Sequence, residues 1–326
     1  MAYRRGMLFM IFIMMFVILL NFVLLVVFNQ GLVDSQVVRS PWFIIFYQVM
    51  SFIVPLALWL GFHKEKLNAH LPHMRLGATN IICIVGLSFL LQPAMMVISG
   101  ITNLFFDNEV STLVMGMADY PLLLLFLAIA VTPAICEEVV FRGYIQKKFE
   151  TKSFWVMALA NGFFFGVMHF NPQQFFYAFA MGVIFAYMVY MTKSIRAAVI
   201  SHFIMNASQV SLLWFTVRMT EFIEYYTETY NGQSDIDVYA LPEEVAIIVA
   251  LALLAFIAIF STVGAVILFR YFAKHNKKRL ENYYAKNLQE EVVEEGIVEE
   301  VKSKDRIIDA SLILVIVALY VFFVFA

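Results

Sequence analysis

The sequence has little charge and almost no cysteine. Charged residues make up 14% of its 326 residues and hydrophobic residues 62%, whereas soluble domains average about 25% and about 45–50%. This excess excludes a water-soluble core, and the lack of any soluble domain argues against nucleic acid as a partner. The two cysteines, Cys83 and Cys136, lie inside apolar stretches, which predicts buried thiols and no disulfide.

Several catalytic and transport patterns are also missing from the sequence. It contains no Gly-x-Ser-x-Gly, no His-Glu-x-x-His and no Gly-x-Gly-Asp. These absences argue against a serine nucleophile elbow, a zinc site of the His-Glu-x-x-His kind and a presenilin-like aspartyl pair. We also find no internal repeat of the kind that paired broken helices give to transporters.

Apolar blocks of roughly 20 residues fill most of the chain, the length that crosses the hydrocarbon core as a helix. Because lipid offers no partner to backbone groups, the sequence predicts an all-α, polytopic transmembrane bundle forming one membrane domain over 1–326. The first block is too long for a signal-peptide core and is expected to stay as a helix. Nine spans are expected near 7–28, 41–62, 78–100, 119–148, 153–170, 173–192, 195–216, 244–270 and 307–325.

The basic residues predict the orientation of these spans. With a cytoplasmic N-terminus, only Arg39 and Arg218 of the 22 Lys and Arg fall in outer loops. The positive-inside rule therefore predicts a multi-pass protein of the cell membrane with its N-terminus in the cytoplasm and its C-terminus outside. The stretch 274–306, dense in Glu and Lys, is expected to be a helical cytoplasmic connector to the last span. Its apolar positions leave open whether it docks on the bundle or on a partner.

Ionisable residues inside spans are functional candidates, because each costs at least about 2.5–3.5 kcal/mol at the bilayer centre. Such residues, with the polar and aromatic residues at helical spacing from them, form three clusters on separate spans: Glu137, Glu138 and Arg142; Phe165 and His169; His202 and Asn206.

Helical spacing places two of the pairs on shared faces. Glu138 and Arg142 are four residues apart, which predicts an ion pair that makes the buried acid tolerable. His202 and Asn206 have the same spacing. Glu137 is turned about 100° from Glu138 and has no such partner, and an unpaired carboxylate in a low-dielectric cavity suits a general base.

Each cluster also has an ordinary interpretation. The two glutamates could be interfacial charges, and either histidine or Asn206 could be a simple hydrogen bond between helices. Their occurrence together favours a catalytic set, because water activation needs an acid and imidazoles in one place. The four other histidines lie among loop Lys and Arg and are expected to be surface residues.

In this order, Glu-Glu-x-x-x-Arg, Phe-x-x-x-His and His-x-x-x-Asn resemble the motifs of the CAAX-protease and bacteriocin-processing (Abi) family of intramembrane proteases. This family includes the eukaryotic enzyme that trims prenylated CAAX proteins. All three motifs match without substitution, within a core expected over 119–216. The resemblance implies a glutamate-dependent endopeptidase that cleaves membrane-anchored or lipidated peptide segments.

The resemblance leaves two versions of the chemistry open. In one, Glu137 and His169 activate water while His202 and Asn206 stabilise the oxyanion. In the other, Glu137, His169 and His202 hold a divalent metal such as zinc, whose bound water attacks. The residues Glu138 and Arg142 are assigned to positioning and electrostatics, and Phe165 is expected to pack one turn before His169.

The distance of each candidate residue along its helix from the cytoplasmic lysines predicts the shape of the fifth helix. Along a helix, Glu137 and His202 lie about 14–17 Å from the nearest cytoplasmic lysines, but His169 lies about 26 Å from its own. We therefore expect the fifth helix to be short or tilted and the cavity to be reached from the cytoplasm. The rival functions are a non-catalytic bacteriocin-immunity protein or scaffold and, less favoured, a proton-coupled transporter. No pattern in the sequence specifies an oligomeric state.

Overall fold

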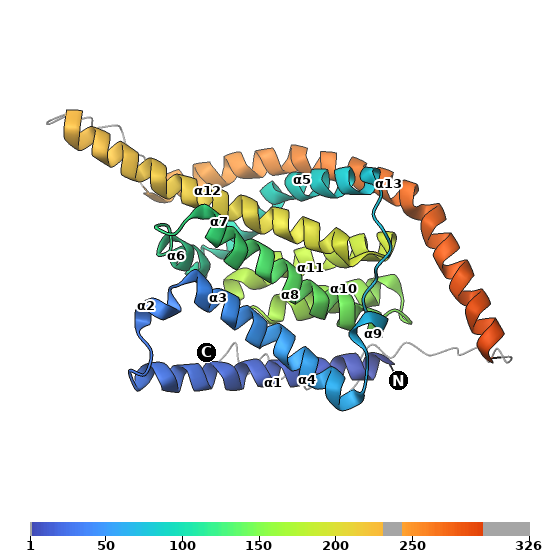
Figure 1. Ribbon diagram of the computed structural model, residues 1–326. Coiled ribbons are helices and arrows are strands. Elements are labelled where there is room, and N and C mark those ends of the chain that lie inside the picture. The colour runs from blue at the N-terminus through green and yellow to red at the C-terminus, as the bar shows by residue number, and fades with distance from the viewer. Residues whose placement is uncertain (1, 231–242, 296–326) are drawn as a thin grey trace.

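The computed structural model describes residues 2–230 and 243–295, and all regular elements in them are helical (Figure 1). Seven of the helices are long and apolar enough to cross a membrane, which confirms the predicted all-α polytopic bundle. The elements are α1 (Ala2–Asn29), α2 (Ser35–Val38), α3 (Pro41–Gln48), η1 (Val49–Ile53), α4 (Val54–His63), η2 (Leu67–Ala69), α5 (Ala78–Thr102), α6 (Glu109–Met115), α7 (Leu122–Leu125), η3 (Phe126–Val131), α8 (Thr132–Glu138), η4 (Val139–Ile145), α9 (Gln146–Lys148), α10 (Phe154–Val167), α11 (Pro172–Thr192), α12 (Ile195–Tyr230) and α13 (Glu243–Glu295).

Eight of the nine predicted spans fall on described helices, and the ninth, 307–325, lies outside the described residues. The last two described helices are longer than the spans predicted from them. Helix α12 continues to Tyr230 and α13 to Glu295, the latter through the first part of the predicted connector. Neither extension contains Gly or Pro, so nothing in the sequence breaks the helix once the apolar stretch has ended.

The short fifth helix is confirmed. Helix α10 has 14 residues, too few for the roughly 20 that a span requires. The chain turns back directly after it, where Phe170 adopts a left-handed conformation with φ 49°. The side chain of Asn171 then accepts a hydrogen bond from the backbone N–H of Gln174 and starts α11. This reversal keeps His169 inside the bundle.

The spans 41–63 and 122–148 each contain π-helical turns, η1 in the first and η3 and η4 in the second. Widened turns of this kind are frequent at functional sites. In the second span Pro133 has no N–H to donate to Ile129 O four residues earlier. That carbonyl accepts a hydrogen bond from Asn206 Nδ2 at 3.0 Å instead. The proline thereby provides an attachment point for α12 next to the glutamates.

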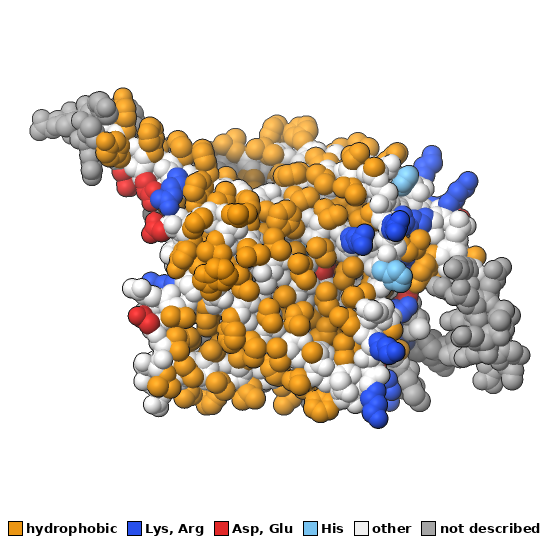
Figure 2. Space-filling model, viewed as in Figure 1, with side chains coloured by type: hydrophobic (Ala, Val, Ile, Leu, Met, Phe, Trp, Pro, Cys, Tyr) orange, Lys and Arg blue, Asp and Glu red, His pale blue; other side chains and the backbone are white. Residues whose placement is uncertain are grey.

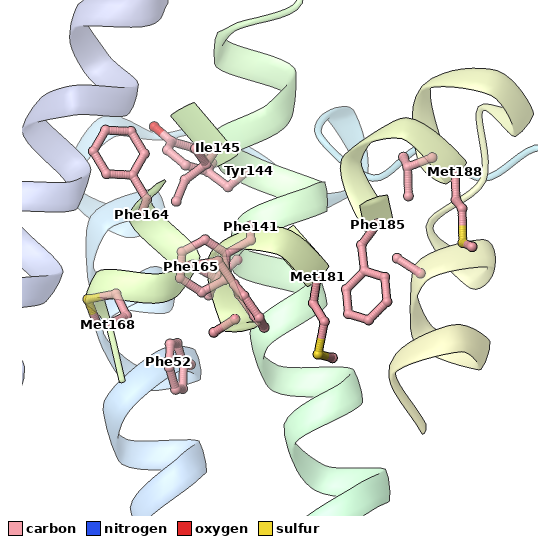
Figure 3. Close-up of a cluster of buried hydrophobic side chains, with 14 of the residues drawn as sticks. Phe52, Phe141, Tyr144, Ile145, Phe164, Phe165, Met168, Met181, Phe185 and Met188 are labelled. Atoms are coloured by element: carbon pink, nitrogen blue, oxygen red, sulfur yellow. The ribbon is translucent and has the colours of Figure 1, made fainter. Parts of the chain in front are cut away.

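The backbones of helices α10 and α11 approach each other closely near the site. A Cβ added to Gly182 would lie 2.6 Å from the Cα of Gly162, so the two backbones meet with no room for a side chain. An aromatic cluster packs beside this crossing (Figure 3). The rings of Phe141 and Phe165 lie 5.2 Å apart at 87°, and Phe52 lies 6.0 Å from Phe141.

Lys and Arg side chains gather at the end of the bundle that holds the N-terminus and α9 (Figures 1 and 2). We call this end the basic end. Ion pairs link separate helices at this end, because Glu65 contacts Arg5 at 2.9 Å and Lys148 at 2.7 Å. At the opposite end Arg218 is paired with Glu221 at 2.7 Å. This distribution is the one that the positive-inside rule requires of a cytoplasmic basic end.

Candidate active site

The Glu138 carboxylate joins two helices. Its Oε1 accepts hydrogen bonds from Arg142 Nη1 at 2.9 Å and from His202 Nδ1 at 2.9 Å. Arg142 also donates from Nη2 to Gly182 O at 3.3 Å, and its guanidinium lies 4.4 Å from the centre of the Phe165 ring. The predicted ion pair is confirmed, and both of its side chains are 0% exposed. A pair this deeply buried holds its neighbours in fixed positions.

Glu137 points into a different environment from Glu138. Gln48 Nε2 donates to Glu137 Oε1 at 3.2 Å, and His202 Nε2 lies 4.0 Å from Glu137 Oε2. The prediction that Glu137 has no partner is therefore wrong. The partner comes from the end of α3, 89 residues away, which helical spacing does not reveal. Gln48 is nevertheless an amide inside an apolar stretch, and that signal could have drawn attention to it.

The hydrogen bond of His169 fixes which of its ring nitrogens carries the proton. Its Nδ1 lies 2.8 Å from Phe165 O, and because a carbonyl only accepts, Nδ1 must donate. In the neutral imidazole, Nε2 is then an acceptor. The Phe165 ring packs edge-on against His169 at 5.1 Å, as expected, and also against His202 at 5.8 Å.

The candidate residues meet at one cavity of about 550 Å³, within the roughly 300–1,000 Å³ of ligand-binding cavities. Glu137, His169, His202 and Asn206 all line it. Gln48, which the motif analysis did not include, lines it as well. Glu138 and Arg142 lie behind the wall, where they hold His202 and Phe165 in place.

The direction of the cavity differs from the prediction. Its lining continues to Asn103, Asn108 and Ser111, around the connection from α5 to α6 at the end opposite the basic end (Figure 1). The expected approach from the basic end is therefore not the direction of this cavity. Distances along the helices predicted how deep the residues lie in the bundle. They gave no information on which helices are separated by the cavity.

The described residues contain no group of three or more His, Cys, Asp or Glu arranged to hold a metal ion. Glu137, His169 and His202 share the cavity without gathering into such a group. As placed, these residues do not fit a three-ligand zinc centre, so we derive no step of the chemistry through a metal.

Comparison with known families agrees with the site. Residues 119–208 match the Rce1-like family model, described as type II CAAX prenyl endopeptidase Rce1-like. The matched segment contains all three motifs, from Glu137 to Asn206. No curated protein and no solved structure matches the chain. Over residues 119–208 the chain is thus similar to the type II CAAX prenyl endopeptidases of the Rce1-like family, and its seven apolar helices make it a multi-pass integral membrane protein.

Proposed function

We propose that the protein hydrolyses a peptide bond in a membrane-anchored or lipidated segment, with Glu137 as the general base. The observation that carries this proposal is that Glu137 of α8, His169 in the turn after α10, and His202 and Asn206 of α12 line one cavity inside the bundle. A carboxylate, an imidazole acceptor and two further polar side chains around one space are what hydrolysis by activated water requires.

Glu137 and His169 share the activation of water in this proposal. Gln48 holds Oε1 of Glu137, while Oε2 is buried without a hydrogen-bond partner among the described residues. This free oxygen accepts the proton of the water whose oxygen attacks the peptide carbonyl carbon. His169 Nε2 accepts the second hydrogen bond and orients the water. The proton then passes from Glu137 to the departing amine as the C–N bond breaks.

His202 and Asn206 stabilise the oxyanion. His202 Nδ1 lies 2.9 Å from Glu138 Oε1 and Nε2 lies 4.0 Å from Glu137 Oε2, and in this proposal His202 acts in the form that has a proton on each ring nitrogen. The Nδ1 proton then goes to Glu138, and the Nε2 proton is directed into the cavity. One N–H of the Asn206 amide donates to Ile129 O, and its second N–H remains to donate to the oxyanion. A preorganised donor of this kind is worth about 2.7–4 kcal/mol in the transition state.

The test is cleavage of a prenylated CAAX peptide, or another lipidated peptide, by the purified full chain in liposomes. Glu137→Gln keeps the size of the side chain but removes the base, and it is expected to reduce kcat by about 10²–10⁴-fold. The control is Glu221→Gln, the same change at an exposed site that pairs with Arg218. Equal cleavage rates for Glu137→Gln and the control would contradict the role of Glu137 as the base, and no cleavage by the wild type would favour a non-catalytic scaffold.

Metal dependence is tested in the same assay. We propose that the reaction proceeds without a metal, so prolonged treatment with a chelator is expected to leave the rate within about twofold of the untreated enzyme. A rate that is lost on chelation and restored by zinc would support the version in which Glu137, His169 and His202 act as ligands.

A further inference from the structure

The site is closed toward the basic end. Between the site and that end lies the cluster of Glu138, Arg142 and His202, whose exposed fractions are 0%, 1% and 3%. A second, smaller cavity of about 340 Å³ reaches Arg142 from the basic end, and none of the residues lining it also lines the site cavity. The charged cluster thus separates the two spaces.

The site cavity opens progressively away from this cluster. Along α12, Asn206 is half-buried at the site, whereas Gln209 and Thr216, further along the same face, are exposed. Along α5 the same change occurs from the half-buried Ser99 to the exposed Asn103. Both walls therefore lead from Glu137 to the end of the bundle opposite the basic end.

Away from its inner end, where Glu137, His169 and His202 lie, the walls of this passage are polar but uncharged. Glu137 is the only Asp or Glu among the described residues that line the cavity, and none of them is Lys or Arg. Amides and hydroxyls supply the polar groups, joined across the cavity where Gln92 Nε2 donates to Ser208 Oγ at 3.1 Å. Gln173 Nε2 likewise donates to Ser99 Oγ at 2.8 Å. Between them lie apolar side chains such as Met96 and Leu213.

Such a passage suits one kind of ligand. Amide and hydroxyl groups both donate and accept hydrogen bonds, as a peptide backbone needs when it leaves water. A charged side chain would find no counter-ion along these walls and would lose its hydration there. The chemistry therefore favours an extended peptide segment that carries uncharged side chains on both sides of the bond to be cut.

Taking the basic end as cytoplasmic, we infer that the cavity is loaded from the extracytoplasmic side, and that its substrate is an uncharged, extended peptide segment of a membrane-anchored protein exposed on that side. The inference rests on the proposed peptidase function for its chemistry. The side of loading rests only on the positions of the basic residues (Figure 2) and on those of the cavity walls.

The side of loading is tested by labelling two single-cysteine additions in intact cells with a membrane-impermeant maleimide. Thr216→Cys lies at the mouth of the cavity, and Thr151→Cys is the same change at an exposed position of the basic end. The unmodified chain is the blank, because Cys83 and Cys136 are both buried. We expect Thr216→Cys to be labelled in intact cells and Thr151→Cys only after permeabilisation. Labelling in the reverse order would overturn the inference.

The route is tested with the same two variants as purified full-length protein. A bulky maleimide on Thr216→Cys is expected to slow cleavage of an uncharged lipidated peptide at least about 10-fold, and the same label on Thr151→Cys is expected to have no effect. Equal rates for the two labelled variants would refute loading past Thr216. Failure of the peptidase proposal would instead show as no cleavage by the unlabelled wild type, and labelling in intact cells would still report the side.

Discussion

A single carboxylate oxygen, Oε1 of Glu138, accepts hydrogen bonds from both Arg142 and His202. Its neighbour in sequence, Glu137, faces the cavity and bonds to Gln48. Two consecutive glutamates thus have separate tasks because the helix turns them about 100° apart. One neutralises a buried arginine and fixes a histidine, and the other remains available for chemistry.

Gln48 is expected to position the general base. Gln48→Leu removes the donor to Glu137 Oε1 and leaves the carboxylate free to rotate, so we expect kcat for peptide cleavage to fall about 10-fold with little change in KM. The measurement is a steady-state comparison in liposomes, together with a thermal unfolding curve to confirm that the variant folds.

The matched control for this prediction is Gln36→Leu, the same change at an exposed residue of α2 outside the cavity. If both variants cleave the peptide at the wild-type rate, Gln48 has no positioning role.

The sequence could predict part of this site at the residue scale. The spacing of Glu138 and Arg142 was sufficient for their ion pair, because the contact lies within one helical span. The contact of Gln48 with Glu137 and that of Asn206 with Ile129 O join distant parts of the chain. No local pattern encodes such contacts, since they depend on how the helices cross.

The position of His169 depends on how helices α10 and α11 pack against each other. Gly182→Ala places a methyl group against the Gly162 backbone, which cannot move aside as a flexible side chain can. We expect the free energy of unfolding to fall by about 1–3 kcal/mol. Cleavage should also slow, because His169 lies in the turn that follows α10 and Gly182 O accepts from Arg142. Thermal unfolding and cleavage rates measure the two effects.

Gly61→Ala provides the contrast for this prediction. Gly61 lies in α4 with nothing within 4 Å of an added Cβ. The same substitution there is expected to stabilise the helix by roughly 0.5–1 kcal/mol and to leave cleavage unchanged. A Gly182→Ala variant as stable as Gly61→Ala would show that the two helices are not packed backbone to backbone.

The turn between α9 and α10 is held by Glu150, which pairs with Lys147 and Lys193. Burial raises the pKa of Glu150, but the two lysines outweigh burial and hold it below the ordinary value of 4.5. Since the pKa is lower in the folded protein, the stabilisation is complete above pH 4.5 and is lost as the pH falls through the folded-state pKa.

Glu150→Gln is therefore expected to reduce the free energy of unfolding by about 1–2 kcal/mol at neutral pH, since the buried Lys193 loses its counter-ion. Once the pH lies below the lowered pKa of folded Glu150, the wild type and the variant are expected to converge. Unfolding curves recorded across this range test the prediction, and a difference that is independent of pH would contradict it.

Element boundaries show what apolar periodicity can and cannot predict. The spans were predictable because hydrocarbon thickness sets a minimum length of apolar residues. Their continuation in α12 and α13 was not, because polar residues extend a helix as well as apolar residues do once it has started. The short α10 was predictable because a full-length straight span would have placed His169 at a different depth from Glu137 and His202.

In the whole molecule, the cavity extends away from the end at which the Lys and Arg side chains gather. Basic residues gather at one end (Figure 2), and the lining of the cavity that contains Glu137 extends toward the other. The gathering of basic residues at one end could be predicted from the sequence by counting Lys and Arg in alternate loops. The direction of the cavity depends on which helices separate around the site, so the sequence-based expectation of access from the cytoplasm did not match it.

The most direct test of whether this bundle assembles one hydrolytic centre is a double-mutant cycle on peptide cleavage with Glu137→Gln, His169→Ala and the double variant. If both groups act on one water molecule, the double variant loses no more in kcat/KM than the more severe single variant, because the second substitution removes a function already lost. Losses that multiply in the double variant would mean that Glu137 and His169 act independently, and would contradict a shared centre.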